Sequence, residues 1–204
     1  MSSLTVSQQN GVKAIKRVRA SFDAQISHLF AGMIENAEQV LFEGLVDVAD
    51  HEQSDREVQM AGQFNLMRAL RLHAPALEGR FGDILKEQRV DLLKNKQRRE
   101  VDDLPDHIET DLVRMARKYN GQFQFLLQAL IDGFTGILER PVEALPLQPV
   151  NMYHIFWTAT EVLEVSAAER ELLIPLFDRY VVDRYVVDRI GRLLAGARES
   201  LGAA

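Results

Sequence analysis

The apolar residues of this chain recur at steps of three and four, and this spacing constrains the fold more than any other feature. Gly32 and Gly44 each cost a helix about 1 kcal/mol relative to alanine, so the first stretch, from about Gly11 to Asp50, predicts two helices or one that bends. Its apolar stripe consists of Ile15, Phe22, Ile26, Leu29, Met33, Ala37, Val40 or Leu41, Leu45 and Val48.

The next boundaries are indicated by capping residues and proline. Ser54 followed by Glu57 is typical of a capping box, in which the two side chains satisfy free backbone N–H groups at a helix start. Proline is tolerated at the first position of a helix, so we expect one helix to end before Pro75 and another to begin there. Short turns between these helices predict antiparallel neighbours.

The most polar stretch of the chain, Lys94 to Asp106, predicts a connector. After it, Asp106 and Glu109 indicate a further helix start, and Asn120-Gly121 is a typical helix end. A strongly apolar helix is then expected from about residue 123 to residue 137.

Three prolines within nine residues, Pro141, Pro146 and Pro149, predict an extended connector, because proline fixes its own backbone and disfavours helix before it. The segment beyond is short for an independent core. We therefore expect one domain over 1–204, with 141–149 as the place where it would subdivide.

Beyond the prolines, Ser166 and Glu169 predict another capping box before a long last helix running towards Leu194. Pro175 is expected to kink that helix or to begin it afresh. No segment shows sustained alternation of apolar and polar residues, the pattern typical of strands. The fold class predicted is all-α: a single-domain helical bundle of about seven helices, with long first and last helices.

Charge and composition limit the partners. The net charge of −6 disfavours nucleic acid, because acidic surfaces repel a phosphate backbone. The absence of cysteine excludes disulfides and fits a reducing compartment. Neither a secretory signal nor an apolar run of about 18 residues is visible, so we expect a cytoplasmic protein that does not enter a membrane.

The sequence shows no motif of a catalytic, cofactor or metal site. The histidines are scattered and no two have the spacing of ligands on one helix face. Ser54 and Ser166 are explained as helix caps, and neither a nucleophile elbow nor a phosphate-binding loop is present. We therefore expect no catalytic residue, no metal ligand and no bound cofactor, and hence no enzyme.

Two clusters are candidates for binding. Tyr153, Phe156 and Trp157 form a dense aromatic patch, which predicts either a protein interface or core packing. Basic residues also cluster, and these either hold an anionic ligand such as a nucleotide second messenger or form a solvated helix face. The basic candidates are Lys94, Lys96, Arg98 and Arg99, joined by Lys13, Lys16, Arg17 and Arg19.

A tandem repeat follows, in which Tyr180 to Arg184 and Tyr185 to Arg189 both read YVVDR. Five residues advance a helix by about 500°, which places the second copy about 140° from the first. One hypothesis is that one copy is buried while the other, with Tyr180, Tyr185, Arg184 and Arg189 as candidates, contacts a partner. The other is a duplication absorbed by a π-bulge.

Two stretches resemble the bacterial family known as domain of unknown function 1631. In residues 35–81 an alanine-acid helix end precedes a polar turn, a helix like Phe64 to Leu70, and a proline before Leu77 to Phe81. Residues 149–194 are similar too, especially Leu176-Phe177-Asp178-Arg179. The resemblance implies a compact member of a bacterial, cytoplasmic, helical family, and it transfers no catalytic residue.

These observations together predict a non-enzymatic helical regulatory or adaptor protein that acts by binding another protein. Self-association is also expected, because the long apolar stripe of the first helix needs a cover. The alternative function is a sensor of a small anionic ligand.

Overall fold

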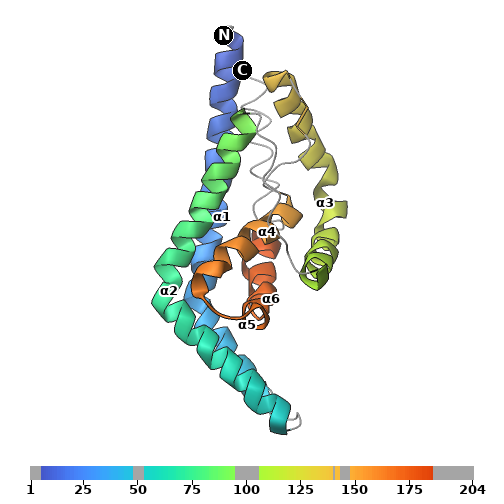
Figure 1. Cartoon of the computed structure of the whole chain (residues 1–204). Coiled ribbons are helices and arrows are strands. Elements are labelled where there is room, and N and C mark those ends of the chain that lie inside the picture. Colours follow the sequence, from blue (N-terminus) through green and yellow to red (C-terminus); the bar gives the residue numbers. More distant parts are fainter. Residues whose placement is uncertain (1–5, 48–52, 95–105, 140, 143–147, 186–204) are drawn as a thin grey trace.

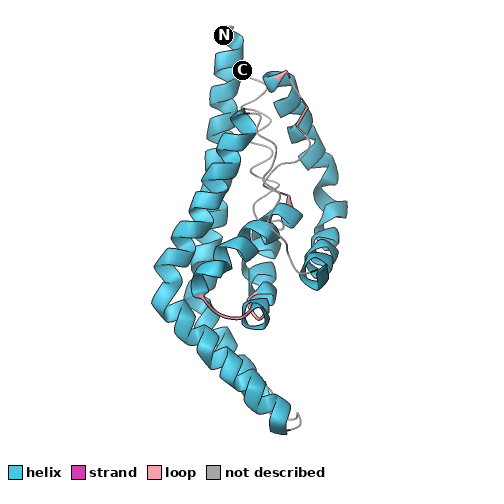
Figure 2. Cartoon of the chain, in the orientation of Figure 1, coloured by secondary structure: helices cyan, strands magenta, loops and turns pink. Residues whose placement is uncertain are grey.

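The computed structural model describes residues 6–47, 53–94, 106–139, 141–142 and 148–185. Within these ranges the chain is helical, with short loops and no strand (Figure 2). The all-α prediction is confirmed.

The first helix, α1 (Val6–Asp47), is continuous through both Gly32 and Gly44. Of the two alternatives left by the sequence, one long helix is therefore correct. The described part of its apolar stripe is buried as the spacing predicted, fully at Ile15, Phe22, Ile26, Met33, Ala37 and Leu41 and partly at Leu29 and Val40. The side chains of Leu45 and Val48 lie outside the described residues. Since other elements of the same chain cover this stripe, the stripe gives no reason for self-association.

The second helix, α2 (Gln53–Lys94), contains Pro75 in its interior, so the predicted boundary at Pro75 is wrong. Its first residue, Gln53, lies two residues before the start that a cap at Ser54 predicts, and the side chains of Ser54 and Glu57 lie outside the described residues. The ribbon bends near its middle (Figure 1), as expected where proline removes a helical hydrogen bond. Leu70 and Leu77 are buried on either side of the proline, and their packing offsets its cost of about 3 kcal/mol.

The third helix, α3 (Asp106–Leu138), begins at the predicted capping residue but runs through Asn120-Gly121 without ending there. The two helices expected in this region are therefore one. The helix ends before Glu139, which has a left-handed φ of 51°, and Pro141 follows closely. Gly121 did not end the helix because its cost of about 1 kcal/mol is small for a long helix that packs on α4 and α1.

The C-terminal part of the described chain is a series of short helices: α4 (Pro149–Ala159), the 3₁₀ helix η2 (Thr160–Leu163), α5 (Ala167–Glu171), α6 (Ile174–Phe177) and the π-helical segment η3 (Asp178–Asp183). The capping box of Ser166 and Glu169 is confirmed at the start of α5. Pro175 lies in the first turn of α6, so it begins a helix afresh as predicted. The predicted long last helix is interrupted at residues 172–173, and its course towards Leu194 lies outside the described residues.

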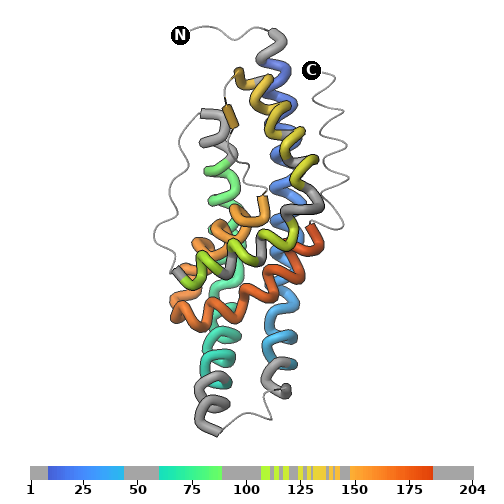
Figure 3. Tube along the Cα trace, turned by 90° about the vertical axis from the view of Figure 1, so that its right-hand side faces the viewer, coloured from blue at the N-terminus to red at the C-terminus, as the bar shows by residue number. Residues whose placement is uncertain are grey.

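Helices α1 and α2 form a long antiparallel hairpin, and the short helices α4 to α6 pack on one of its faces (Figures 1 and 3). Helix α3 lies beyond them and contacts α4 and α1. Four rings from α1, α2, α4 and α6 meet at the centre: Phe30 stacks on Phe81 at 4.0 Å between centroids, and Phe156 stacks on Phe177 at 4.2 Å. Side chains before and after the proline connector thus share one core. The single domain over 1–204 stays a prediction, because both ends lie outside the described residues.

Candidate functional site

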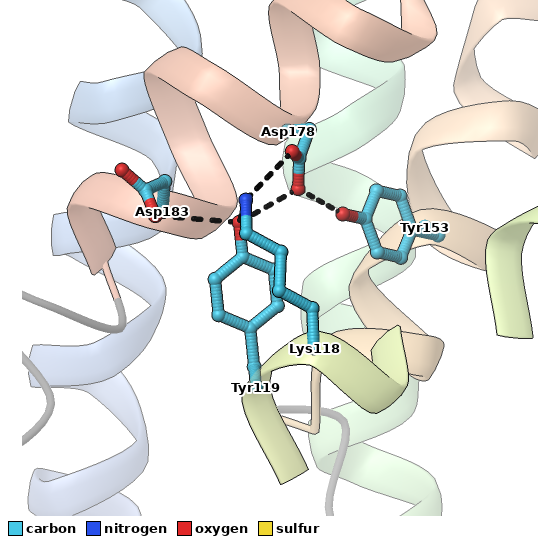
Figure 4. A network of polar contacts seen from close by, with 5 residues as sticks. All are labelled: Lys118, Tyr119, Tyr153, Asp178 and Asp183. Carbon is cyan, nitrogen blue, oxygen red and sulfur yellow. Dashed lines mark hydrogen bonds and ion pairs between the residues drawn. The ribbon is translucent and has the colours of Figure 1, made fainter. Parts of the chain in front are cut away.

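A network of polar side chains joins three elements that are far apart in the sequence (Figure 4). The Asp178 carboxylate, at the start of η3, accepts hydrogen bonds from the hydroxyls of Tyr153 on α4 and Tyr119 on α3, the latter at 2.8 Å. The Lys118 ammonium donates to the Tyr119 hydroxyl at 2.9 Å and to Asp178 Oδ2 at 3.4 Å. Asp183 Oδ1 lies 3.4 Å from the Tyr119 hydroxyl and offers it a second acceptor.

The electrostatics of this network keep its tyrosines protonated. Burial raises the pKa of Tyr119 to about 12, although the hydrogen bond from Lys118 acts in the opposite direction. Burial also raises the pKa of Tyr153, and the hydrogen bond to Asp178 raises it further. The hydrogen bond with Tyr119 raises the pKa of the Lys118 ammonium. The phenols are therefore donors at neutral pH, whereas an activated tyrosine nucleophile needs a lowered pKa.

A second polar cluster is buried between α1 and the end of η3. Arg19 is 0% exposed, and its guanidinium lies 3.1 Å from the carboxylate of Asp23 one turn later. Burial raises the pKa of the neighbouring Tyr185, while the charges of Arg19 and Asp23 act on it in opposite directions. The sequence placed Arg19 in a solvated or anion-binding cluster, and the structure corrects this: Arg19 is a core residue paired within its own helix.

The aromatic patch predicted as an interface also lies inside the molecule. Tyr153 and Phe156 are fully buried, and Trp157 is buried beneath the Arg170 guanidinium, 4.3 Å above its ring. Of the two alternatives that the sequence allowed for these residues, core packing is correct and a surface interface is wrong. The physical reason is that α4 runs between the hairpin and α3, so its aromatic side chains have neighbours on both sides.

Tyr180 to Asp183 of the first YVVDR copy lie in η3, the π-helical segment, and so the described part of the repeat agrees with the π-bulge hypothesis. A π-helix bonds residue i to i+5, which brings residues five apart closer to one face. Tyr180 is accordingly half-buried and Tyr185 buried. Arg184 is exposed and lies 5.2 Å from the Tyr180 ring, whereas Arg189 is outside the described residues.

The predicted anion-binding cluster is not placed by the structure. Lys94 is the last residue of α2, but its side chain, and all of Lys96, Arg98 and Arg99, lie outside the described residues. Anion binding there stays a prediction.

The sequence did not single out an exposed aromatic pair on the hairpin. Phe42 of α1 is 56% exposed and Phe64 of α2 is 52% exposed. The Arg71 guanidinium donates to both carboxylate oxygens of Glu38, at 2.9 Å and 2.8 Å, and this ion pair shows which residues of the two helices lie level with each other. Phe42 follows Glu38 by four residues and Phe64 precedes Arg71 by seven, so each lies within about 40° of the ion pair around its helix.

These residues belong to one surface, which we call the outer face. Arg68 is rotated by about 160° from both Leu66 and Leu70, which are buried. Glu35 is rotated by the same angle from Met33 and Ala37, which are fully buried. The outer face is thus opposite the buried side of the hairpin that α4 to α6 cover (Figures 1 and 3). It consists of Glu35, Glu38 and Phe42 on α1 and of Phe64, Arg68 and Arg71 on α2.

The fold is that of an all-α protein built on a long bent hairpin, with a partly buried polar network joining α3, α4 and η3. The chain belongs to the family described as protein of unknown function (DUF1631), N-terminal domain, which matches residues 11–197. This match includes both stretches that carried the resemblance and the region between them. No curated protein and no solved structure matches the chain.

Among the described residues, no group of three or more His, Cys, Asp or Glu side chains has the arrangement needed to hold a metal ion. The helices that the structure describes also lack any stretch with the length and apolar content needed to cross a bilayer.

Proposed function

We propose that the chain is a non-enzymatic regulatory or adaptor protein that acts by binding protein, and that the outer face is its binding surface. The observation that carries this proposal is the pair of exposed phenylalanines, Phe42 and Phe64. Large aromatic side chains on a rigid surface, surrounded by charged groups, are typical anchors of protein interfaces.

The scaffold supports this function because it holds the outer face rigidly. The opposite side of the hairpin is covered by α4 to α6, α1 packs along α2, and Glu38 pairs with Arg71 across the two helices on the exposed side. A preformed surface loses little conformational entropy on binding.

The polar network supports the non-enzymatic part of the proposal. Its tyrosines have raised pKa values, and Asp178 shares its carboxylate among Tyr119, Tyr153 and Lys118. All of these groups serve to hold α3, α4 and η3 together, which is a structural task.

The test is a co-purification of the full chain from its native cells, compared with a Phe42→Ser/Phe64→Ser variant by quantitative mass spectrometry. We expect protein, whether other chains or further copies of this one, to be enriched with the unmodified chain and lost with the variant. The control is Phe125→Ser on α3, because Phe125 is 84% exposed but lies outside the outer face. Equal recovery with all three chains would reject the proposal.

A further inference from the structure

Charge is divided between the two helices of the hairpin in a way that the interaction function alone does not explain. Residues 20–47 of α1 include Glu35 and Glu38 and contain no lysine or arginine. Residues 58–77 of α2 include Arg68 and Arg71 and contain no aspartate or glutamate. The outer face therefore has an acidic half on α1, which includes Phe42, and a basic half on α2, which includes Phe64.

A surface with this division is complementary to itself under one particular twofold rotation. In this arrangement two outer faces are stacked, and the twofold axis runs between them, parallel to the hairpin. Helix α1 of each copy then lies on α2 of the other copy. The acidic half then faces the basic half at both contacts. Phe42 of each copy lies near Phe64 of the other, because both residues lie on the same side of the Glu38–Arg71 ion pair along the hairpin. An axis across the hairpin would instead place α1 on α1 and α2 on α2, where like charges repel.

We infer that the occupant of the outer face is a second copy of this chain, joined through the first of these two arrangements. The inference rests on the proposed function, since it names the protein that binds the proposed surface. The hairpin bends near the middle of α2 so that the outer face is convex (Figure 1), and two convex faces diverge away from their contact. The interface is accordingly small, and the dimer forms in a concentration-dependent way.

The experiment measures the mass of the purified full chain by sedimentation and light scattering over a concentration series. Glu38→Arg and Arg71→Glu each place like charges opposite each other, because Glu38 of one copy lies level with Arg71 of the other, and each is expected to raise the dimer dissociation constant about tenfold or more. When the two variants are mixed, the arginine introduced at position 38 of one chain faces the glutamate introduced at position 71 of the other. The unmodified Arg71 and Glu38 of the two chains also face each other, so the mixture is expected to dimerise like the unmodified chain.

The control is Arg117→Glu, which makes the same charge change at an exposed position on α3. It is expected to leave the dimer unchanged, and circular dichroism of every variant checks that the fold is retained. A chain that stays monomeric at all concentrations, or a mixture no more associated than its components, would overturn the inference. In either case, enrichment of a different protein that depends on Phe42 and Phe64 would still support the proposed function.

Discussion

The shared carboxylate of Asp178 is the point at which the polar network is most sensitive to substitution. Asp178→Ala removes the acceptor of the buried Tyr153 hydroxyl, while Tyr119 still has Asp183 at 3.4 Å. Leaving one buried hydroxyl unsatisfied costs about 1–3 kcal/mol. Adding the partial loss at Tyr119 and Lys118, we expect the free energy of unfolding to fall by about 2–4 kcal/mol.

The measurement is urea unfolding with linear extrapolation, in a cycle of Asp178→Ala, Tyr153→Phe and the double variant. The double variant no longer contains an unsatisfied phenol at position 153. Its loss should therefore be smaller than the two single losses combined, by about 1–2 kcal/mol. Asp132→Ala on α3 is the control, because its carboxylate is exposed and accepts an exposed hydrogen bond from Gln128 one turn earlier, and it should cost less than about 0.5 kcal/mol. Additive losses, or an Asp178 effect no larger than the control, would refute the reasoning.

Three further predictions concern other parts of the molecule. Because folding raises the pKa of Tyr119 from about 10 to about 12, the contribution of its protonated hydroxyl to stability is complete below pH 10 and is lost between pH 10 and pH 12. Tyr119→Phe should therefore flatten the fall of the melting temperature over this range, and an unchanged alkaline melting profile would contradict this prediction. Asp23→Ala removes the carboxylate that pairs with the buried Arg19 charge, and it should lower the free energy of unfolding in urea by about 3 kcal/mol. The double variant Arg19→Met/Asp23→Leu should lose far less, and equal losses would argue against a buried ion pair. If a nucleotide binds to the basic cluster of Lys94, Lys96, Arg98 and Arg99, a nucleotide concentration of about 100 times its Kd should raise the free energy of unfolding by about 2.7 kcal/mol. A thermal-shift assay measures this as a higher melting temperature, and no shift with any nucleotide would remove the sensor alternative.

The features that the sequence predicted correctly are those set by neighbouring residues. The stripe of α1 follows from local spacing, and the capping box of Ser166 and Glu169 involves residues three apart. Local signals failed where packing outweighed them. Pro75 and Asn120-Gly121 each disfavour helix by about 1–3 kcal/mol, and burial of a few apolar side chains on either side offsets that amount.

The polar sites were missed for two different reasons. Tyr119 and Asp178 are 59 residues apart in the chain, and no spacing rule joins them before the fold is known. Arg19 did have a signal, because it lies within the apolar stripe of α1 and is followed by Asp23 at the spacing of a helical ion pair. The outer face was missed because its two phenylalanines lie on different helices, and only the alignment of the hairpin brings them to one side.

The central claim, that the outer face binds protein, is tested most directly by photo-crosslinking. A benzophenone amino acid is introduced in place of Phe64 on the outer face and, separately, in place of Phe125 on α3. Both positions are exposed phenylalanines, so the probe is accessible at each. We predict a crosslinked protein product from position 64, from a second copy or another chain, and little from position 125. Absence of a product at position 64, or equal products at both positions, would contradict the claim.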